Sequence, residues 1–362
     1  MFTTATPSKR YNFSLNLAKL ISIASVALLL LACEDKSIEE QAPSNTQTKE
    51  LQLTTISPDQ ADTLPSNLKT PLTQHYLSLA SEQFQSTCAN AEQLQASVQL
   101  FLSDPNEIAL KETRQHWLST HNNYAASKLF RALNIKHPVL DHSQIDPVKH
   151  SLAIRIDQSP LLPGYLDAIE GYPQSGYVFS PIPINKETLN KEHQFSDTLY
   201  VTLGFHSIEF LLWGEGNEQT RKSTDYATLT GNKENSELAQ DRRSQLLSLT
   251  TKLLAEDLQT QCKEWLTAKG YYPSQLRALP EEEQNEYIIA TMEQLLHDIQ
   301  INSTQIKNAT ELHSAFAHSD VQDLQAQIKL FKSLLESKEW KELSKKQERA
   351  KKITKSAKAL LQ

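Results

Sequence analysis

The chain has 362 residues, a formal net charge of −7 and a hydrophobic fraction of 39%, which is enough apolar material for a sizeable core and for two domains of ordinary size. Only 8 residues are glycine, and this scarcity disfavours architectures built on tight turns. No glycine-rich phosphate-binding motif occurs, so nucleotide binding is not expected. The acidic balance also argues against a nucleic-acid partner.

Residues 1–32 predict a lipoprotein signal peptide. Three basic residues precede an uncharged apolar run at 20–31, which is shorter than the roughly 20 residues that a membrane-spanning helix needs. The run ends in Leu-Leu-Ala-Cys at 30–33, a pattern typical of a bacterial lipobox, in which Cys33 becomes the lipidated first residue. An ordinary signal peptide with a chance cysteine is the alternative. Glu34 after the cysteine favours the outer membrane, so we expect a lipid-anchored protein of the bacterial cell envelope that faces the periplasm.

The next residues, 33–70, are rich in Ser, Thr, Gln, Asp and Pro and predict a flexible tether. From 72 to 102 apolar residues recur at helical spacing, and Asp104 with Pro105 is expected to open a second helix that runs to about residue 133. Residues 134–187 are proline-rich and predict long ordered loops with a short helix near 162–169.

Helical periodicity then returns for the rest of the chain. The further helices are expected at 196–213, 238–268, 281–307, 321–335 and 338–361. This pattern predicts an all-α fold of two helical bundles joined by a proline-rich connection. The N-terminal bundle with its loops is expected at 71–190, and the C-terminal bundle at 191–362.

Beyond Cys33 the sequence contains two more cysteines, Cys88 and Cys262. In an oxidising compartment two such thiols either form a disulfide or stay buried. Their spacing does not decide between these alternatives, because a disulfide depends on geometry that the sequence does not give.

The segment from Val201 to Gly214 carries the strongest chemical signal. On a helix, His206 and Glu209 lie three residues apart and project from the same face. An imidazole and a carboxylate placed in this way can share a metal ion, as histidine and carboxylate side chains do inside helical bundles. Gly204 would let another backbone or a ligand approach the helix closely. The alternative is a structural pair of buried polar groups that satisfy each other.

The motif Gly204-x-His206-x-x-Glu209, followed by Phe-Leu-Leu-Trp-Gly, resembles the signature of the imelysin-like family. This family is classed as peptidase family M75 and includes iron-regulated periplasmic lipoproteins. Further segments that resemble it are WLSTHNNYAASKLFR at 117–131, RIDQSPLLPGYLD at 155–167, RKSTDY at 221–226 and ELHSAFAHSDVQD at 311–323. The resemblance extends from about Tyr76 to Leu335 and implies two helical bundles with a site between them.

The resemblance also implies roles for particular residues. It implies that His206 and Glu209 hold a divalent or ferric metal ion, with iron expected, and that further residues line the cleft between the bundles. These cleft candidates are Gly204, Arg155, Asp157, Asp167 and His313. Lys128 departs from the family pattern, since many relatives have an acidic residue there. If that acid supplies a ligand or a charge, this chain lacks it.

Other interpretations of the same residues stay open. Arg155 and Asp157 can pair with each other or hold loop backbone, and Asp167 can be a carboxylate at a helix end. Asp320 is well placed as the N-cap of a helix. For His313 the sequence does not decide between a capping role and a place in the cleft.

These residues leave three functions to consider. The sequence has no HExxH motif and no nucleophile motif, so a peptidase of the M75 type would lack an assigned base, and no catalytic residue is predicted. A metal-free scaffold that binds a peptide or a protein is a further alternative. We expect a lipid-anchored protein that binds a metal ion, or a ligand carrying one, in an interdomain cleft and passes it to an iron-uptake system or transporter.

Overall fold

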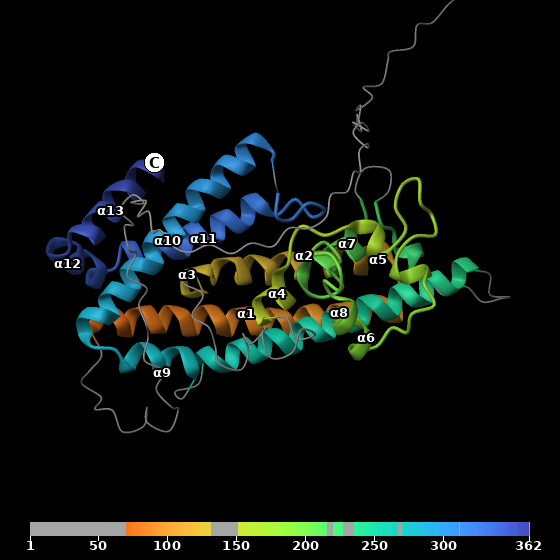
Figure 1. Ribbon diagram of the computed structural model, residues 1–362, viewed down its shortest axis with the longest axis horizontal. Coiled ribbons are helices and arrows are strands. Elements are labelled where there is room, and N and C mark those ends of the chain that lie inside the picture. The colour runs from red at the N-terminus through yellow and green to blue at the C-terminus, as the bar shows by residue number, and fades with distance from the viewer. Residues whose placement is uncertain are drawn as a thin grey trace, which may run out of the picture. The chain divides into compact units, whose positions relative to one another are not determined.

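The computed structural model describes residues 70–131, 151–215, 220–226, 235–266, 270–310 and 312–361 (Figure 1). Within these ranges the chain forms helices joined by loops, with isolated β-bridges but no strand. This confirms the all-α prediction. A membrane-crossing helix is not found in the described part, because no helix there is both long and apolar enough. The predicted signal peptide, Cys33 and most of the predicted tether lie outside the described residues.

Two long helices form the base of the fold. Helix α1 (Pro71–Ser103) packs along α8 (Asn235–Leu266), and on another side it contacts α2 (Glu107–Ala126) (Figure 1). Helix α1 buries one apolar stripe at helical spacing, which explains why the periodicity of this segment predicts it so well. The buried apolar residues of the stripe are Leu72, Tyr76, Ala80, Phe84, Cys88, Ala91, Leu94, Val98 and Phe101.

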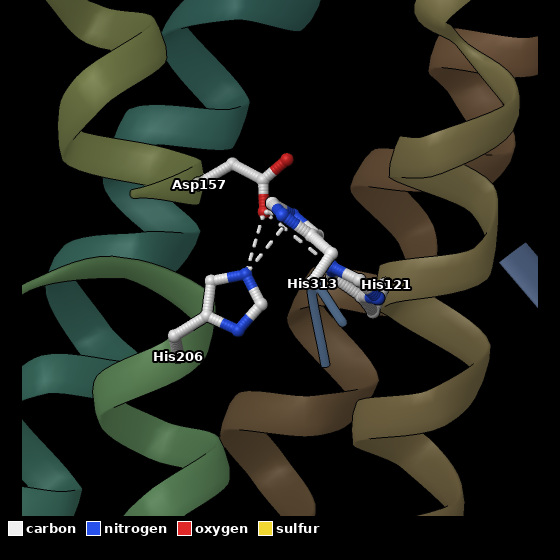
Figure 2. Close-up of side chains that lie close together, drawn as sticks. All are labelled: His121, Asp157, His206 and His313. Carbon is white, nitrogen blue, oxygen red and sulfur yellow. Dashed lines mark hydrogen bonds and ion pairs between the residues drawn. The ribbon is translucent and has the colours of Figure 1, made fainter. Parts of the chain in front are cut away.

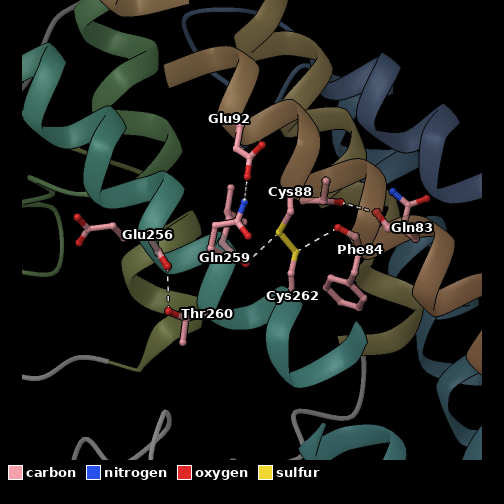
Figure 3. Close-up of a disulfide and its surroundings, with 10 residues drawn as sticks. Gln83, Phe84, Cys88, Glu92, Glu256, Gln259, Thr260 and Cys262 are labelled. Atoms are coloured by element: carbon pink, nitrogen blue, oxygen red, sulfur yellow. Dashed lines mark hydrogen bonds between the residues drawn. A yellow bond between two sulfur atoms is a disulfide. The ribbon is translucent and has the colours of Figure 1, made fainter. Parts of the chain in front are cut away.

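A disulfide ties these two helices together. Cys88 of α1 and Cys262 of α8 are bonded across 174 residues of sequence, and their Cα atoms are 6.5 Å apart (Figure 3). Close to it, Phe84 stacks on Trp265 with ring centroids 5.0 Å apart. Of the two alternatives left open by the sequence, the structure therefore has the paired one. In the chain-entropy model, closing a loop of this length raises the free energy of the unfolded chain by about 5 kcal/mol.

The C-terminal helices cover α2 and α1. Helix α10 (Glu281–Asn308) packs beside α11 (Asp320–Leu335), and α11 lies against α2. Helices α12 (Lys338–Lys346) and α13 (Glu348–Leu360) form a hairpin that contacts α1 and α10. Contacts such as α1 with α8 and α2 with α11 cross residue 190, where the sequence predicts a boundary between bundles. The division into 71–190 and 191–362 stays a prediction.

Several helix boundaries differ from those predicted. Asn106, not Asp104, caps α2, because its side chain accepts a hydrogen bond from the backbone N–H of Ala109. The helix predicted from residue 196 begins only at Gly204. The last predicted helix is divided at Gln347, whose extended backbone separates α12 from α13.

Short helices occupy the stretch that was predicted as loops. These are α4 (Leu152–Asp157), α5 (Pro163–Leu166), which lies where a short helix was predicted, the 3-10 turn η2 (Tyr177–Phe179) and the start of α6 (Lys186–Glu192). Helix α3 (Lys128–Arg131) lies within the predicted second helix. A further short helix, α9 (Tyr271–Ala278), follows α8. Helix α4 contacts both α7 (Gly204–Trp213) and α8.

Candidate metal centre

Four side chains from four parts of the chain meet at one point. His121 comes from α2, Asp157 ends α4, His206 lies in the first turn of α7, and His313 precedes α11. Each offers one nitrogen or oxygen atom, and these atoms all lie within 4.8 Å of one another (Figure 2). Three of the four residues are among those singled out from the sequence, and His121 is not.

The spacing within this cluster suits a metal ion. Oδ1 of Asp157 lies 3.4 Å from Nε2 of His121, 3.2 Å from Nε2 of His206 and 3.1 Å from Nε2 of His313. The Nε2 atoms of His206 and His313 are 3.1 Å apart. Ligand atoms about 2.1 Å from a tetrahedral ion lie about 3.4 Å from one another. These four distances are therefore close to those that such an ion would require.

Gly204 brings α7 to α4. Its φ of +82° is one that only glycine adopts without strain, and a Cβ atom there would lie 2.5 Å from the carbonyl oxygens of both Arg155 and Ile156. Any side chain would therefore push the start of α7 away from the end of α4. Because His206 and Asp157 sit at these two ends, the glycine allows the pair to meet. The close approach expected at Gly204 is that of the α4 backbone.

Glu209 stands behind His206 and not among the four ligand atoms. Its Oε2 is 2.7 Å from Nδ1 of His206, and its Oε1 accepts hydrogen bonds from the backbone N–H groups of Phe316 and Ala317 at 2.9 and 2.7 Å. The carboxylate is fully buried and both of its oxygens are engaged. The prediction of Glu209 as a direct ligand is thus corrected. It orients the His206 ring and fixes the loop that carries His313.

His121 has a matching arrangement. Its Nδ1 lies 3.1 Å from Oδ2 of Asp323, and its ring stacks on Trp117 with centroids 4.7 Å apart. Trp117 in turn donates a hydrogen bond from Nε1 to the carbonyl of Phe205, the residue before His206. The sequence did not distinguish His121 from the core residues of α2, because His121 falls at the same helical spacing as they do. Its place four residues after Trp117, within a segment that resembles the family, is the signal that was available.

The charges of the cluster depend on one another. Burial opposes protonation of His121, but the carboxylates of Asp323 and Asp157 outweigh it and raise its pKa to about 10. Burial likewise opposes protonation of His206, while Asp157 and Glu209 raise its pKa to about 9. Burial would raise the pKa of Asp157, yet the imidazoles, led by His313, hold it well below its usual range. In the metal-free protein, protons therefore supply the positive charge that a metal ion would otherwise bring.

Two of the predicted cleft residues lie in ion pairs elsewhere. Arg155 forms a two-point ion pair with Asp257, with Nε–Oδ2 and Nη2–Oδ1 distances of 3.1 and 3.0 Å, and it also bonds to Asn190. Asp167 is fully buried and takes hydrogen bonds from Arg221 and Arg243. Neither side chain joins the four ligand atoms, and their predicted place in a cleft stays a prediction. Nor does Arg155 pair with Asp157, the other interpretation that the sequence left open.

The loop of His313 is held by the start of α11. Oδ1 of Asp320 accepts hydrogen bonds from the backbone N–H groups of His313 at 2.7 Å and Ser314 at 3.3 Å. Asp320 is the first residue of α11, and Ser319 takes the N-cap position. The capping role predicted for Asp320 is therefore wrong. Its side chain reaches back to position a ligand-bearing loop.

The fold and this site together define an all-α protein in which three imidazoles surround one half-buried carboxylate. The family model described as imelysin, peptidase family M75, matches residues 80–362, so the chain belongs to the imelysin family. No curated protein matches the chain.

Proposed function

We propose that the protein binds a metal ion through His121, Asp157, His206 and His313, with iron as the natural metal. One observation carries this proposal. Two of the three imidazoles have Nδ1 at hydrogen-bond distance from a buried carboxylate, 2.7 Å for His206 and 3.1 Å for His121, while Nε2 faces Asp157. A carboxylate that holds one ring nitrogen and leaves the other for a metal is the usual support of a histidine ligand.

The arrangement has a chemical consequence for the neutral rings. When Nδ1 of His206 donates its proton to Glu209, Nε2 presents a lone pair toward the Asp157 carboxylate. Lone pairs and a carboxylate oxygen at 3.2–3.4 Å repel each other unless a cation lies among them. Protons can fill this role at low pH and a metal ion at higher pH. Three imidazoles with one carboxylate suit iron and other first-row transition metals.

The location proposed for this binding is the periplasmic side of a bacterial membrane. The Leu-Leu-Ala-Cys pattern at 30–33 and the polar stretch that follows support a lipid anchor at Cys33. The disulfide between Cys88 and Cys262 supports an oxidising compartment. A protein anchored in this way can capture an ion outside the cytoplasm and hand it to an iron-uptake component. Replacement of Cys33 by Ser is expected to move the protein from the membrane to the soluble fraction.

Metal titration of the full-length protein in detergent tests the site. Fe²⁺ without oxygen and Zn²⁺ are added in separate experiments, and heat release and melting temperature are recorded. A ligand that binds the native state must raise the melting temperature by mass action. The variant His206→Ala should lose most of this rise, while His297→Ala, which removes an exposed imidazole on α10, should keep it. Equal binding by both variants would reject the site, and no metal effect at all would favour a metal-free scaffold.

A further inference from the structure

A cavity of about 350 Å³ adjoins the metal centre. His121, Asp157 and His313 border it on one side. The other walls come from α3, α10 and α11, and they differ in chemistry. One part is cationic, one part presents oxygen acceptors, and one part is apolar. These three kinds of wall define the ligand that the cavity can hold.

The acceptors come from one face of α11. Asp323 and Gln327 are four residues apart on this helix and are each 6% exposed. Oδ1 of Asp323 and Oε1 of Gln327 are buried and have no hydrogen-bond partner among the described residues. Oδ2 of Asp320, which also lines the cavity, is in the same state. A buried acceptor without a donor is unfavourable, so these three oxygens call for donors from a ligand.

The cationic part is supplied by α3. The guanidinium of Arg131 lies 3.9 Å over the ring of Tyr124 and donates to Oγ of Ser127 and the carbonyl of Tyr124. No carboxylate of a described residue pairs with it, and these bonds leave other N–H groups of the fork unused. Lys128 is different, because its ammonium pairs with Asp298 at 3.0 Å. Among the described residues, Arg131 is therefore the cation of this wall that has no anion paired with it.

The apolar part lies between these polar walls. Ile306, Leu312 and Leu324 contribute to the lining of the cavity. A purely ionic ligand would leave these side chains facing water or charge. A ligand with a short aliphatic group would cover them and gain from their burial.

We propose that this cavity binds a free α-amino acid with an aliphatic side chain, its carboxylate facing Arg131 and its ammonium facing Asp323 and Gln327. A planar guanidinium is the preferred partner of a carboxylate. Two carboxylates among the acceptors favour a cationic donor over a hydroxyl. The proposal uses none of the four metal-ligating atoms, although Asp323 also contacts His121 through its other oxygen, so amino-acid binding and metal binding are measured separately.

Calorimetric titration of the full-length protein with L-leucine, after treatment with EDTA, is the test. We expect one site per chain. The same titration with 4-methylpentanoate, which lacks the ammonium, and with isopentylamine, which lacks the carboxylate, should show at least tenfold weaker binding. If leucine does not bind, or if either truncated compound binds as well as leucine does, the proposal is wrong.

Two variants place the ligand in the cavity. Arg131→Gln should weaken leucine binding at least tenfold, whereas Lys128→Gln, a matched change in the same wall at a residue already paired with Asp298, should change it less than threefold. A melting temperature of the metal-free Arg131→Gln variant close to that of the parent shows that the variant is folded. Equal effects of the two variants would contradict the assignment of the carboxylate to Arg131. Binding of leucine without metal binding, or the reverse, separates this proposal from the proposed metal function.

Discussion

Asp157 and Asp167 are ten residues apart, and each is a carboxylate held by cationic partners inside the fold, yet their surroundings differ. Asp167 is fully buried, and its oxygens take hydrogen bonds from the guanidinium groups of Arg221 and Arg243 at 2.5–2.9 Å. Asp157 faces three imidazoles at 3.1–3.4 Å and borders a cavity. Buried carboxylates alone therefore do not mark a functional site.

The partner decides what each carboxylate can do. Arginine keeps its charge at every pH a protein meets, and its fork saturates the oxygens of Asp167, so that cluster is a fixed structural tie. Histidine can exchange its proton for a metal ion, so the Asp157 cluster can change state. The comparison teaches that exchangeable partners and access to a cavity, more than burial, distinguish a binding site from a structural ion pair.

Loss of the fixed tie should have the largest effect. Asp167→Asn removes the negative charge that two buried arginines share, and breaking a buried ion pair in this way costs about 3–5 kcal/mol. Urea denaturation should show this loss in the free energy of unfolding. At low temperature, where the variant is folded, its metal affinity should equal that of the parent. A destabilisation below about 1 kcal/mol would erase the contrast between the two clusters.

A smaller effect is expected behind the metal centre. Glu209→Gln retains an acceptor for the backbone N–H groups of Phe316 and Ala317 but no longer accepts a proton from Nδ1 of His206 as a carboxylate does. Loss of such a supporting partner lowers metal affinity about 10–100-fold. Competition against a chelator of known affinity measures it. Parental affinity in the variant would show that the carboxylate does not orient the ring.

We expect the Asp157 cluster, and not the Asp167 cluster, to make stability depend on pH between about pH 6.5 and 10. The folded-state pKa values of His121 and His206, about 10 and about 9, lie above the ordinary value of 6.5. Their contribution to stability is complete below about pH 6.5 and is lost as the pH rises through 9 and 10. The melting temperature of the metal-free protein should fall over this range, while the rise caused by metal should grow as protons cease to compete.

Two comparisons check the origin of this pH effect. Asp157→Asn removes a carboxylate that helps to raise the pKa of both His121 and His206, so the fall in melting temperature between pH 6.5 and 10 should become shallower. Lys128→Ala is the control, because Lys128 pairs with Asp298 outside the cluster. Its change of melting temperature with pH should match that of the parent. An identical slope in Asp157→Asn and the parent would assign the pH dependence to other groups.

The smallest effect is expected at Lys128 itself. Its ion pair with Asp298 is partly exposed, with side-chain exposures of 35% and 18%, and pairs of this kind contribute about 0.2–1 kcal/mol. Lys128→Ala should lower the free energy of unfolding by no more than that and leave metal affinity within twofold. A large loss of metal affinity would mean that Lys128 itself serves the ion.

The sequence predicted the helical fold and part of the site for local reasons. Helical spacing identifies the face that carries His206, and the resemblance to the family pointed to Asp157 and His313. His121 was missed because it occupies a position in the apolar stripe of its helix. The spacing of His206 and Glu209 fixes their shared face but not which atoms meet a third residue, so a supporting carboxylate was taken for a ligand.

The ion pairs were out of reach for a different reason. Arg155 lies 102 residues from its partner Asp257, and Asp167 lies 76 residues from Arg243. Such pairings depend on how α4, α5 and α8 come together, which periodicity along the chain does not encode. Residues of one short segment, only a few positions apart, thus serve different clusters.

The four candidate ligands are unequally open to water. The side chain of His313 is 46% exposed, against 19% for Asp157 and 2% or less for His121 and His206. His313 is also the ligand carried by a loop, whose hold on the fold includes the Glu209 and Asp320 hydrogen bonds. The cluster therefore has one side that is open to water, at His313, and one side that is buried, at His121 and His206. In the proposed metal site, an incoming or departing ion would therefore exchange on the side of His313, the candidate ligand most open to water.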